Sequence, residues 1–147
     1  MMTKKMDIHE SPTPRQIAED WFSYLEQGNF VGARALLDDN VLWENIPSTP
    51  GVSDLAPWLG SYRGVEAALK SLEVWAAHAR LLSFKLLRLL VDGSEAVGIV
   101  HEHGQCLANG KKYDVYVAEN IRIEGGRITQ YRTYWDISPL IKAFRNN

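Results

Sequence analysis

The first half of the chain carries apolar residues at helical spacing. A helix is predicted to begin at Thr13-Pro14-Arg15-Gln16, because a threonine cap, a proline at the first helical position and a glutamine three residues after the cap are typical of a helix N-terminus. Gly28 is expected to end this helix. Its apolar residues share one face, namely Ile17, Trp21, Tyr24 and Leu25.

Two further helices, a strand and a loop are predicted before the spacing of apolar residues changes from helical to alternating. A short amphipathic segment, 30–37, follows directly, and Asp38-Asp39-Asn40 is expected to end it before a strand at 41–45. Residues 47–64 contain three prolines and three glycines, which predicts a long loop that folds over other parts of the protein. Helical spacing returns over 65–79 and predicts the third helix.

The second half alternates apolar and polar residues, which is typical of strands. Four strands are predicted, at 81–91, 96–107, 112–124 and 127–137. Because the dipeptides between them are typical of hairpin turns, the strands are expected to form an antiparallel meander, followed by a short helical turn through Phe144. Helices followed by strands predict an α+β fold, with the helices packed on one face of a curved sheet. The three turn dipeptides are Asp92-Gly93, Asn109-Gly110 and Gly125-Gly126.

The alternation also identifies the buried face of this sheet. Between residues 113 and 123 the odd-numbered positions are apolar, with the exception of Glu119. The last strand alternates in the same way, with Tyr131, Thr133 and Trp135 on one face. A three-residue turn formed by Glu124-Gly125-Gly126 would bring both odd faces to the same side of the sheet.

The turn at Asn109-Gly110 determines where Glu102 lies. A turn of two residues pairs Ala108 with Lys111, and this register places Glu102 opposite Val117. Glu102 is therefore predicted on the inner face of the sheet.

In this register, Glu102 lies diagonally across from Glu119, roughly 7 Å away between the carbons that anchor the side chains. Burial and a neighbouring like charge both disfavour ionisation, so such a pair keeps one carboxyl protonated near neutral pH and supplies one acid and one base. The alternative is that either glutamate lies at the rim of the sheet or pairs with an arginine. A register slip of one residue would instead bring His101 and His103 to the inner face.

Composition narrows the class of protein. The 147 residues, 46% of them hydrophobic, predict one domain at 13–147 after a disordered tail at 1–12. A formal net charge of -2 argues against a basic nucleic-acid surface, and the single cysteine, Cys106, excludes an internal disulfide. The first residues lack the apolar run of a signal peptide or membrane anchor. We therefore expect a cytoplasmic protein that binds neither nucleic acid nor membranes.

Two segments resemble one known family, the nuclear transport factor 2-like (NTF2-like) fold. They are Leu42-Trp43-Glu44-Asn45-Ile46-Pro47 and the stretch from Arg127-Ile128 to Tyr134-Trp135-Asp136, and the resemblance extends over 14–144. The family includes ketosteroid isomerase, limonene epoxide hydrolase, scytalone dehydratase and the SnoaL-like polyketide cyclases. The resemblance implies a cone of strongly curved sheet and three helices around an apolar pocket, often in a dimer packed through the sheet.

Compared with limonene epoxide hydrolase, the resemblance places Trp43 and Asn45 where that enzyme has the tyrosine and asparagine that hold its attacking water. Glu102 falls at the position of the aspartate that serves as the acid in that enzyme. Val100 replaces its arginine, and Thr133 replaces its water-activating aspartate. The hydrolase set is therefore incomplete in this sequence.

Compared with ketosteroid isomerase, the resemblance places Glu119 at the carboxylic acid of the oxyanion hole. Asn45 replaces the base aspartate, and an amide cannot abstract a proton. Trp21 replaces the oxyanion tyrosine. If the register were slipped, the histidines would be catalytic candidates, because scytalone dehydratase uses histidines.

The sequence thus favours a cofactor-free enzyme that acts on a small hydrophobic metabolite by general acid-base chemistry, of the isomerase, cyclase, dehydratase or epoxide hydrolase type. Glu119 is the predicted proton donor or base, Glu102 its partner and Asn45 an orienting amide. The alternative is a non-catalytic protein that binds an apolar ligand or serves as a dimeric scaffold. The predicted lining of the pocket consists of Trp21, Trp43, Trp58, Val100, Val115, Val117, Thr133 and Trp135.

The remaining chemistry-bearing residues are histidines. His101 and His103 are expected on the outer face of the sheet, at a homodimer interface to which Ile99, Tyr116 and Tyr134 add apolar area. Spacing alone indicates no third metal ligand near them, so we expect no metal site.

Overall fold

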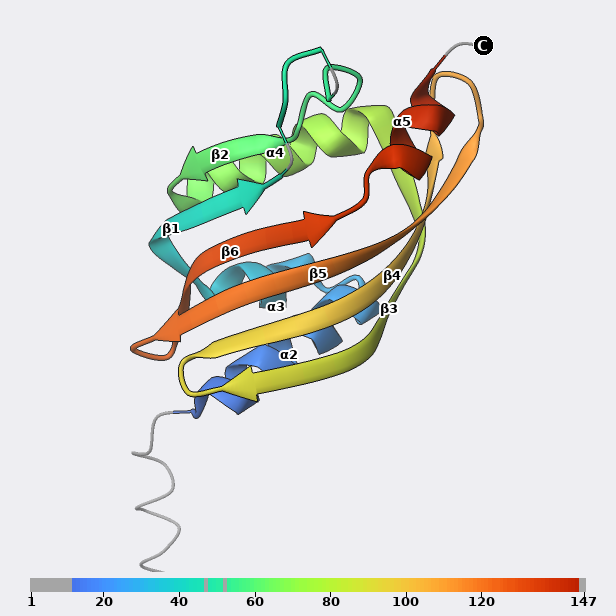
Figure 1. Ribbon diagram of the computed structural model, residues 1–147. Coiled ribbons are helices and arrows are strands. Elements are labelled where there is room, and N and C mark those ends of the chain that lie inside the picture. Colours follow the sequence, from blue (N-terminus) through green and yellow to red (C-terminus); the bar gives the residue numbers. More distant parts are fainter. Residues whose placement is uncertain (1–11, 47, 52, 146–147) are drawn as a thin grey trace, which may run out of the picture.

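The computed structural model describes residues 12–46, 48–51 and 53–145 and is built around one six-stranded sheet. The strands follow the order β2-β1-β6-β5-β4-β3, and all neighbours are antiparallel except β1 and β6, which run parallel. The long strands curl around helices α2 and α3 (Figure 1). The elements are α2 (Pro14–Gln27), α3 (Phe30–Ala35), β1 (Leu37–Asn45), β2 (Gly60–Arg63), α4 (Val65–His78), β3 (Ala79–Asp92), β4 (Glu95–Cys106), β5 (Lys112–Glu124), β6 (Arg127–Trp135) and α5 (Ser138–Phe144).

This arrangement confirms the predicted α+β fold, with helices packed on a mostly antiparallel sheet and a short helix at the end. Within the described residues, no helix has both the length and the apolar character needed to cross a membrane. The tail predicted at 1–12 lies outside the described residues, apart from its last position.

Helix α2 begins and ends where local signals place it. The Gln16 backbone N–H donates to the Thr13 hydroxyl at 3.2 Å, and the Thr13 N–H donates to the Gln16 side-chain oxygen at 2.8 Å. Both exposed donors at the helix start are thereby satisfied. Gly28 ends the helix in the left-handed conformation, with φ of 70°. The residues that α2 buries against the sheet are Ile17, Ala18, Trp21 and Phe22.

The first strand is longer than predicted, because it begins at Leu37 and not at residue 41. Leu37 is buried and pairs with Ile128 of β6, whose backbone N–H donates to the Leu36 carbonyl at 2.8 Å. The polar residues Asp38-Asp39-Asn40 form an irregular part of the strand instead of ending a helix. The expected loop at 47–64 also contains the short strand β2, which pairs with the end of β1.

The predicted meander β3-β4-β5-β6 is confirmed, but the turn between β4 and β5 is not the predicted two-residue turn. Cys106 and Lys111 close this hairpin, with the Cys106 N–H donating to the Lys111 carbonyl at 2.8 Å, so the loop has four residues. Either two-residue form requires a positive φ at its first position, which would be Asn109, and no described residue other than glycine has one. Asn109 instead accepts from the Lys111 N–H and donates to the Ala143 carbonyl, which fastens helix α5 to the loop.

The turn between β5 and β6 also differs from the three-residue prediction. Glu124 pairs with Arg127, so only Gly125 and Gly126 form the turn, with φ of 59° and 77°. The odd-numbered faces of the two strands still coincide, because a one-residue bulge near Thr129 shifts the register. The predicted buried face of β5 is therefore correct.

Helix α2 packs closely against the sheet at Gly98, which has no side chain. A Cβ atom added at Gly98 in β4 would lie 2.2 Å from Cζ of Phe22, whose ring is fully buried. Gly98 pairs with Glu119, so this contact adjoins the unusual carboxyl on the inner face.

We predict that Gly98→Ala destabilises the protein by about 1 to 3 kcal/mol, because the methyl group overlaps a packed aromatic ring. Urea denaturation measures this change. Combining it with Phe22→Leu should cost less than the sum of the two single substitutions, since the smaller side chain makes room. Additive effects of the two substitutions would show that the contact is not tight.

Candidate active site

The inner face of the sheet carries both glutamates that the sequence singled out. Glu102 in β4 pairs with Val115, and Glu119 in β5 pairs with Gly98. The predicted pairing of Glu102 with Val117 is therefore wrong by two residues, because the turn is longer than expected. A shift of two preserves the face, so Glu102 lies inside as predicted.

The corrected register increases the separation of the two glutamates along the sheet. Glu119 lies four positions beyond the residue that Glu102 faces, which corresponds to about 13 Å of strand. The predicted diagonal contact at roughly 7 Å is therefore wrong. Their charges still interact, because Glu102 raises the pKa of Glu119. The glutamates are thus two separate carboxyl groups on one concave face.

Glu119 is enclosed by the protein, with only 5% of its surface exposed. The indole N–H of Trp21 in α2 donates to its Oε1 at 3.5 Å, and its carboxyl group also shares a hydrogen bond with the hydroxyl of Tyr131. Burial, reinforced by the charge of Glu102, raises the pKa of Glu119 to about 8, although both hydrogen bonds act in the opposite direction. At neutral pH this carboxyl group is mostly protonated.

Glu102 lies in a comparable but more accessible setting. The Tyr113 hydroxyl donates to its Oε2 at 3.4 Å, and the Trp75 indole is hydrogen-bonded to that hydroxyl in turn. Burial raises the pKa of Glu102 to about 7, and the hydrogen bond from Tyr113 opposes the shift. Glu102 is therefore joined directly to one tyrosine and only through it to a tryptophan, whereas Glu119 is bonded directly to both Trp21 and Tyr131.

Aromatic rings fix the position of the Tyr131 hydroxyl beside Glu119. Trp43 of β1 stacks on Tyr131, with ring centroids 3.7 Å apart and planes 8° apart. Trp21 meets both rings edge-on, at 6.2 Å from Trp43 and 6.1 Å from Tyr131. The buried indole nitrogen of Trp43 has no hydrogen-bond partner among the described residues.

The structure brings Asn45 close to Glu119 through Thr133. Thr133 pairs with Glu119 across β5 and β6, and its hydroxyl lies 3.1 Å from Oδ1 of Asn45. The same hydroxyl accepts the Ile46 N–H at 3.0 Å. Trp135 donates its indole N–H to the Ile46 carbonyl. Thr133 and Trp135 thus hold the backbone at the end of β1, beside the predicted orienting amide.

The other residues predicted to line a pocket are buried but do not all lie together. Val100, Val115 and Val117 are on the inner face, at most 5% exposed. Trp58 packs instead against the rings of His78 and Phe144, at 6.2 Å and 5.6 Å, near the end of α4. An open hollow of about 400 Å³ adjoins this region, and none of the predicted lining residues contribute to it. It is lined by Leu55, Ala77, His78, Cys106, Leu107, Ala108 and Phe144.

Sequence reasoning missed the two tyrosines that bond to the glutamates. Strand alternation predicts both Tyr113 and Tyr131 on the inner face, but only as members of an apolar stripe. Tyr131 pairs with Ile121 and therefore lies diagonally across from Glu119. This diagonal position is the feature of the sequence that could indicate a hydrogen bond between the two side chains.

The histidines lie on the outer face, as predicted, with different neighbours. The predicted two-residue turn would place His101 beside Ala118 and His103 beside Tyr116, whereas His101 faces Tyr116 and His103 faces Asp114, a shift of two residues. This shift introduces a carboxylate beside the two imidazoles.

Comparisons with known proteins agree with this architecture. A family model described as a SnoaL-like domain matches residues 18–131. No curated protein matches the sequence. An NTF2-like protein from Burkholderia thailandensis E264 superposes with a TM-score of 0.80 at 20% identity, covering 91% of this chain and 98% of that one.

Two further solved structures carry descriptions of activity. A protein from Mesorhizobium loti, provisionally described as a SnoaL-like polyketide cyclase, has a TM-score of 0.71 at 19% identity and covers 84% of this chain and 99% of its own. An epoxide hydrolase from M. tuberculosis, described as LEH-like, has a TM-score of 0.66 at 18% identity and covers 89% and 88%. At these identities the similarity establishes the fold.

We predict that the stability of the protein falls as pH rises from the ordinary value of Glu119, 4.5, to about 8. Across this window the folded protein retains a proton that the unfolded chain releases, so rising pH favours unfolding. Glu119→Gln should therefore gain stability relative to the natural protein, by roughly 3 to 5 kcal/mol above that window and little below it.

Urea denaturation at a series of pH values measures this difference. Glu73→Gln, at an exposed position of α4, is the matched control and should show no such trend. A pH-independent difference between Glu119→Gln and the natural protein would contradict the protonated state of Glu119. The groups facing this carboxyl are Trp21, Glu102 and Tyr131, and they remain in the variant.

Proposed function

Because this chain belongs to the SnoaL-like domain family of the NTF2-like superfamily, we propose that it is an enzyme that moves protons on a small hydrophobic metabolite without a cofactor. The observation that carries this proposal is the buried Glu119, held between the Trp21 indole and the Tyr131 hydroxyl. A carboxyl group kept neutral at physiological pH is a general acid.

Within this proposal, Glu119 and Glu102 act at two ends of one substrate. Glu119 donates a proton to a carbonyl oxygen while Glu102 removes a proton from a nearby carbon, so the C–H electron pair becomes a C=C bond and the C=O pair becomes an O–H bond. Glu102 then returns its proton to another carbon, and the O–H proton returns to Glu119. The substrate is isomerised, and both carboxyl groups regain their starting states.

Isomerisation fits the residues better than epoxide hydrolysis does. The hydrolase mechanism needs a carboxylate to activate water at the position of Thr133, and the Thr133 hydroxyl is engaged with Asn45 and the Ile46 backbone. The amide of Asn45 is hydrogen-bonded to Thr133, the residue that pairs with Glu119 across the sheet, and is suited to orient a polar group of the substrate. Cyclisation and dehydration use the same pair of acid and base and are included in the proposal.

The surroundings support a hydrophobic substrate. The inner face around the two carboxyls is apolar and aromatic, and such surfaces favour apolar ligands oriented by a few polar groups. The buried residues that surround them are Trp21, Trp43, Val100, Val115, Val117 and Tyr131.

A second candidate function is binding without turnover. The close stacking of Trp43 on Tyr131, with Trp21 edge-on to both, fills space that a substrate would need beside Glu119. Rings packed in this way are typical of a structural core. In that case the chain holds an apolar ligand elsewhere or serves as a scaffold.

We propose a cytoplasmic protein, consistent with the single cysteine, and a homodimer through the outer sheet face. Tyr116 and Tyr134 on that face are 60% and 53% exposed. Light scattering distinguishes a dimer from a monomer.

The catalytic proposal predicts turnover of at least one member of a panel that contains a β,γ-unsaturated cyclic ketone, a cyclisable polyketide analogue and a tertiary alcohol. Glu119→Gln and Glu102→Gln should each lower kcat by roughly 100-fold or more, because each removes one proton-transfer group. Deuterium incorporation from heavy water, followed by mass spectrometry, measures the exchange at carbon independently of product formation.

Glu73→Gln, at an exposed position, should leave turnover unchanged and serves as the control. Full activity in both glutamine variants would overturn the assignment of the two carboxyls. Saturable quenching of tryptophan fluorescence by the panel compounds, without exchange or product, would instead support the binding function.

A further inference from the structure

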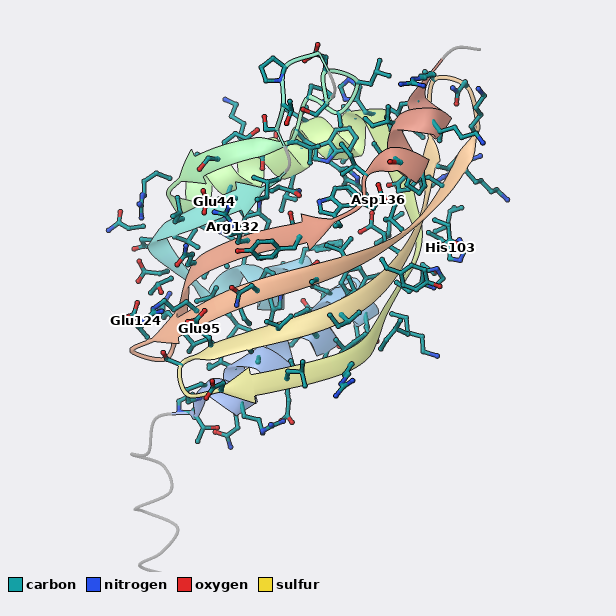
Figure 2. The ribbon with its side chains drawn as sticks, in the orientation of Figure 1. Glu44, Glu95, His103, Glu124, Arg132 and Asp136 are labelled. Carbon is teal, nitrogen blue, oxygen red and sulfur yellow. The ribbon has the colours of Figure 1, made fainter. Side chains whose placement is uncertain are left out.

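A cluster of three metal-binding side chains lies on the outer face of the sheet, where the proposed chemistry uses none of them. His101 and His103 are two positions apart on β4, and Asp114 of β5 lies directly opposite His103. One ligand atom from each of the three lies within 4.8 Å of the other two. His103 projects outward from the side of the long strands (Figure 2).

Both imidazoles are directed at the same carboxylate. Nε2 of His101 contacts Oδ1 of Asp114, and Nε2 of His103 lies 3.7 Å from its Oδ2. The ring of His101 stacks on Tyr116 from the neighbouring strand, with centroids 4.5 Å apart and planes 11° apart. This stacking restricts the rotation of the imidazole and holds its Nε2 toward Asp114.

We propose that this cluster binds a borderline divalent transition-metal ion such as Zn²⁺, with Nε2 of His101, Nε2 of His103 and one oxygen of Asp114 as ligands. Two imidazoles and a carboxylate form a ligand set that suits Zn²⁺ and its neighbours and disfavours Mg²⁺ and Ca²⁺, which require oxygen ligands.

The distances are compatible with this ligand set. Tetrahedral zinc with bonds of about 2.0 to 2.1 Å places its ligand atoms about 3.3 Å apart. An ion therefore requires the direct contact between His101 Nε2 and Asp114 to open and the longer separations, of up to 4.8 Å, to close, each by a movement of the side-chain tips of about 1 Å. The side chains of His103 and Asp114 are 44% and 53% exposed in the single chain. The remaining coordination position is therefore open to solvent there, and to the partner subunit in the homodimer proposed through this face.

The metal site is independent of the inner carboxyls. Adjacent residues of a strand point to opposite faces, so Glu102 faces inward although it lies between the two histidines in sequence. The proposal does not rest on the enzymatic function, and each can fail without the other.

Positively charged side chains on the outer face oppose cation binding, among them Lys85 and Lys112, the latter two positions before Asp114 on β5. Lys85 of β3 pairs with His101 and is exposed. Residues paired across antiparallel strands point to the same face, so Lys85 shares the face of the cluster. Its removal should leave the metal affinity unchanged or raise it, whereas removal of a ligand should lower the affinity.

The test is isothermal titration of the untagged full chain with ZnCl₂, after treatment with a chelator to remove bound ions. We expect one ion per chain, and His103→Ala and Asp114→Asn should each weaken binding by roughly tenfold or more. His78→Ala, which removes a histidine from the end of α4, and Lys85→Ala are the controls and should not weaken binding. Near-ultraviolet circular dichroism verifies that each variant is folded.

Substitution with Co²⁺ gives a second readout, because a tetrahedral site with nitrogen and oxygen ligands has intense visible absorption. This absorption should be present in the natural protein and absent in Asp114→Asn. Equal Zn²⁺ affinity in the natural protein, His103→Ala and Asp114→Asn would overturn the proposal. Lack of saturable uptake at micromolar concentrations, or loss of uptake in His78→Ala, would also overturn it.

Discussion

The burial of the Glu119 carboxyl between helix α2 and the sheet is the constraint on which the rest of the inner face depends. An ionised carboxylate in this position would lose its hydration, so the group stays neutral and its pKa rises to about 8. The Trp21 indole donates to it from α2, and the hydroxyl of Tyr131 in β6 bonds to it as well. Helix and sheet must therefore meet at a fixed distance. Gly98 permits that distance because it leaves room for the ring of Phe22.

Strand alternation in β4 gives this protein two chemically different faces from three consecutive residues. Glu102 faces the apolar interior, while His101 and His103 face outward to Asp114. A single property, the register between β4 and β5, thus determines the separation of the two glutamates and the partners of the histidines. That register depends on the loop that contains Asn109. The side-chain amide of Asn109 donates a hydrogen bond to the Ala143 carbonyl in helix α5.

Features that arise from local interactions can be predicted from the sequence. Features that depend on contacts between residues far apart in the chain cannot be predicted in this way. The start and end of α2 follow from Thr13, Gln16 and Gly28, all within or beside the helix. The buried face of β5 follows from alternation alone. The start of β1 at Leu37 could not be predicted in this way, because its partner Ile128 is far along the chain. Strand β2 cannot be predicted for the same reason, since only its pairing with β1 distinguishes it from a loop.

The features of the candidate site also differ in whether the sequence predicts them. The inward position of both glutamates was predictable, because a register error of two residues keeps the face. Their separation, and the hydrogen bonds from Tyr113 and Tyr131, depend on the actual pairing and were not predictable. Asp114 was not recognised as a partner of His103, since it pairs with that residue only when the loop has four residues.

The inner face described above requires Glu119 to be a neutral acid in the folded protein at physiological pH. Infrared difference spectroscopy of the natural protein against Glu119→Gln tests it directly, because a protonated carboxyl has a C=O stretch that a carboxylate lacks. We expect this band in the natural protein near neutral pH, and we expect it to disappear as pH rises through about 8. A carboxylate signal for Glu119 at neutral pH, with no C=O band, would show instead that Glu119 is ionised in the folded protein.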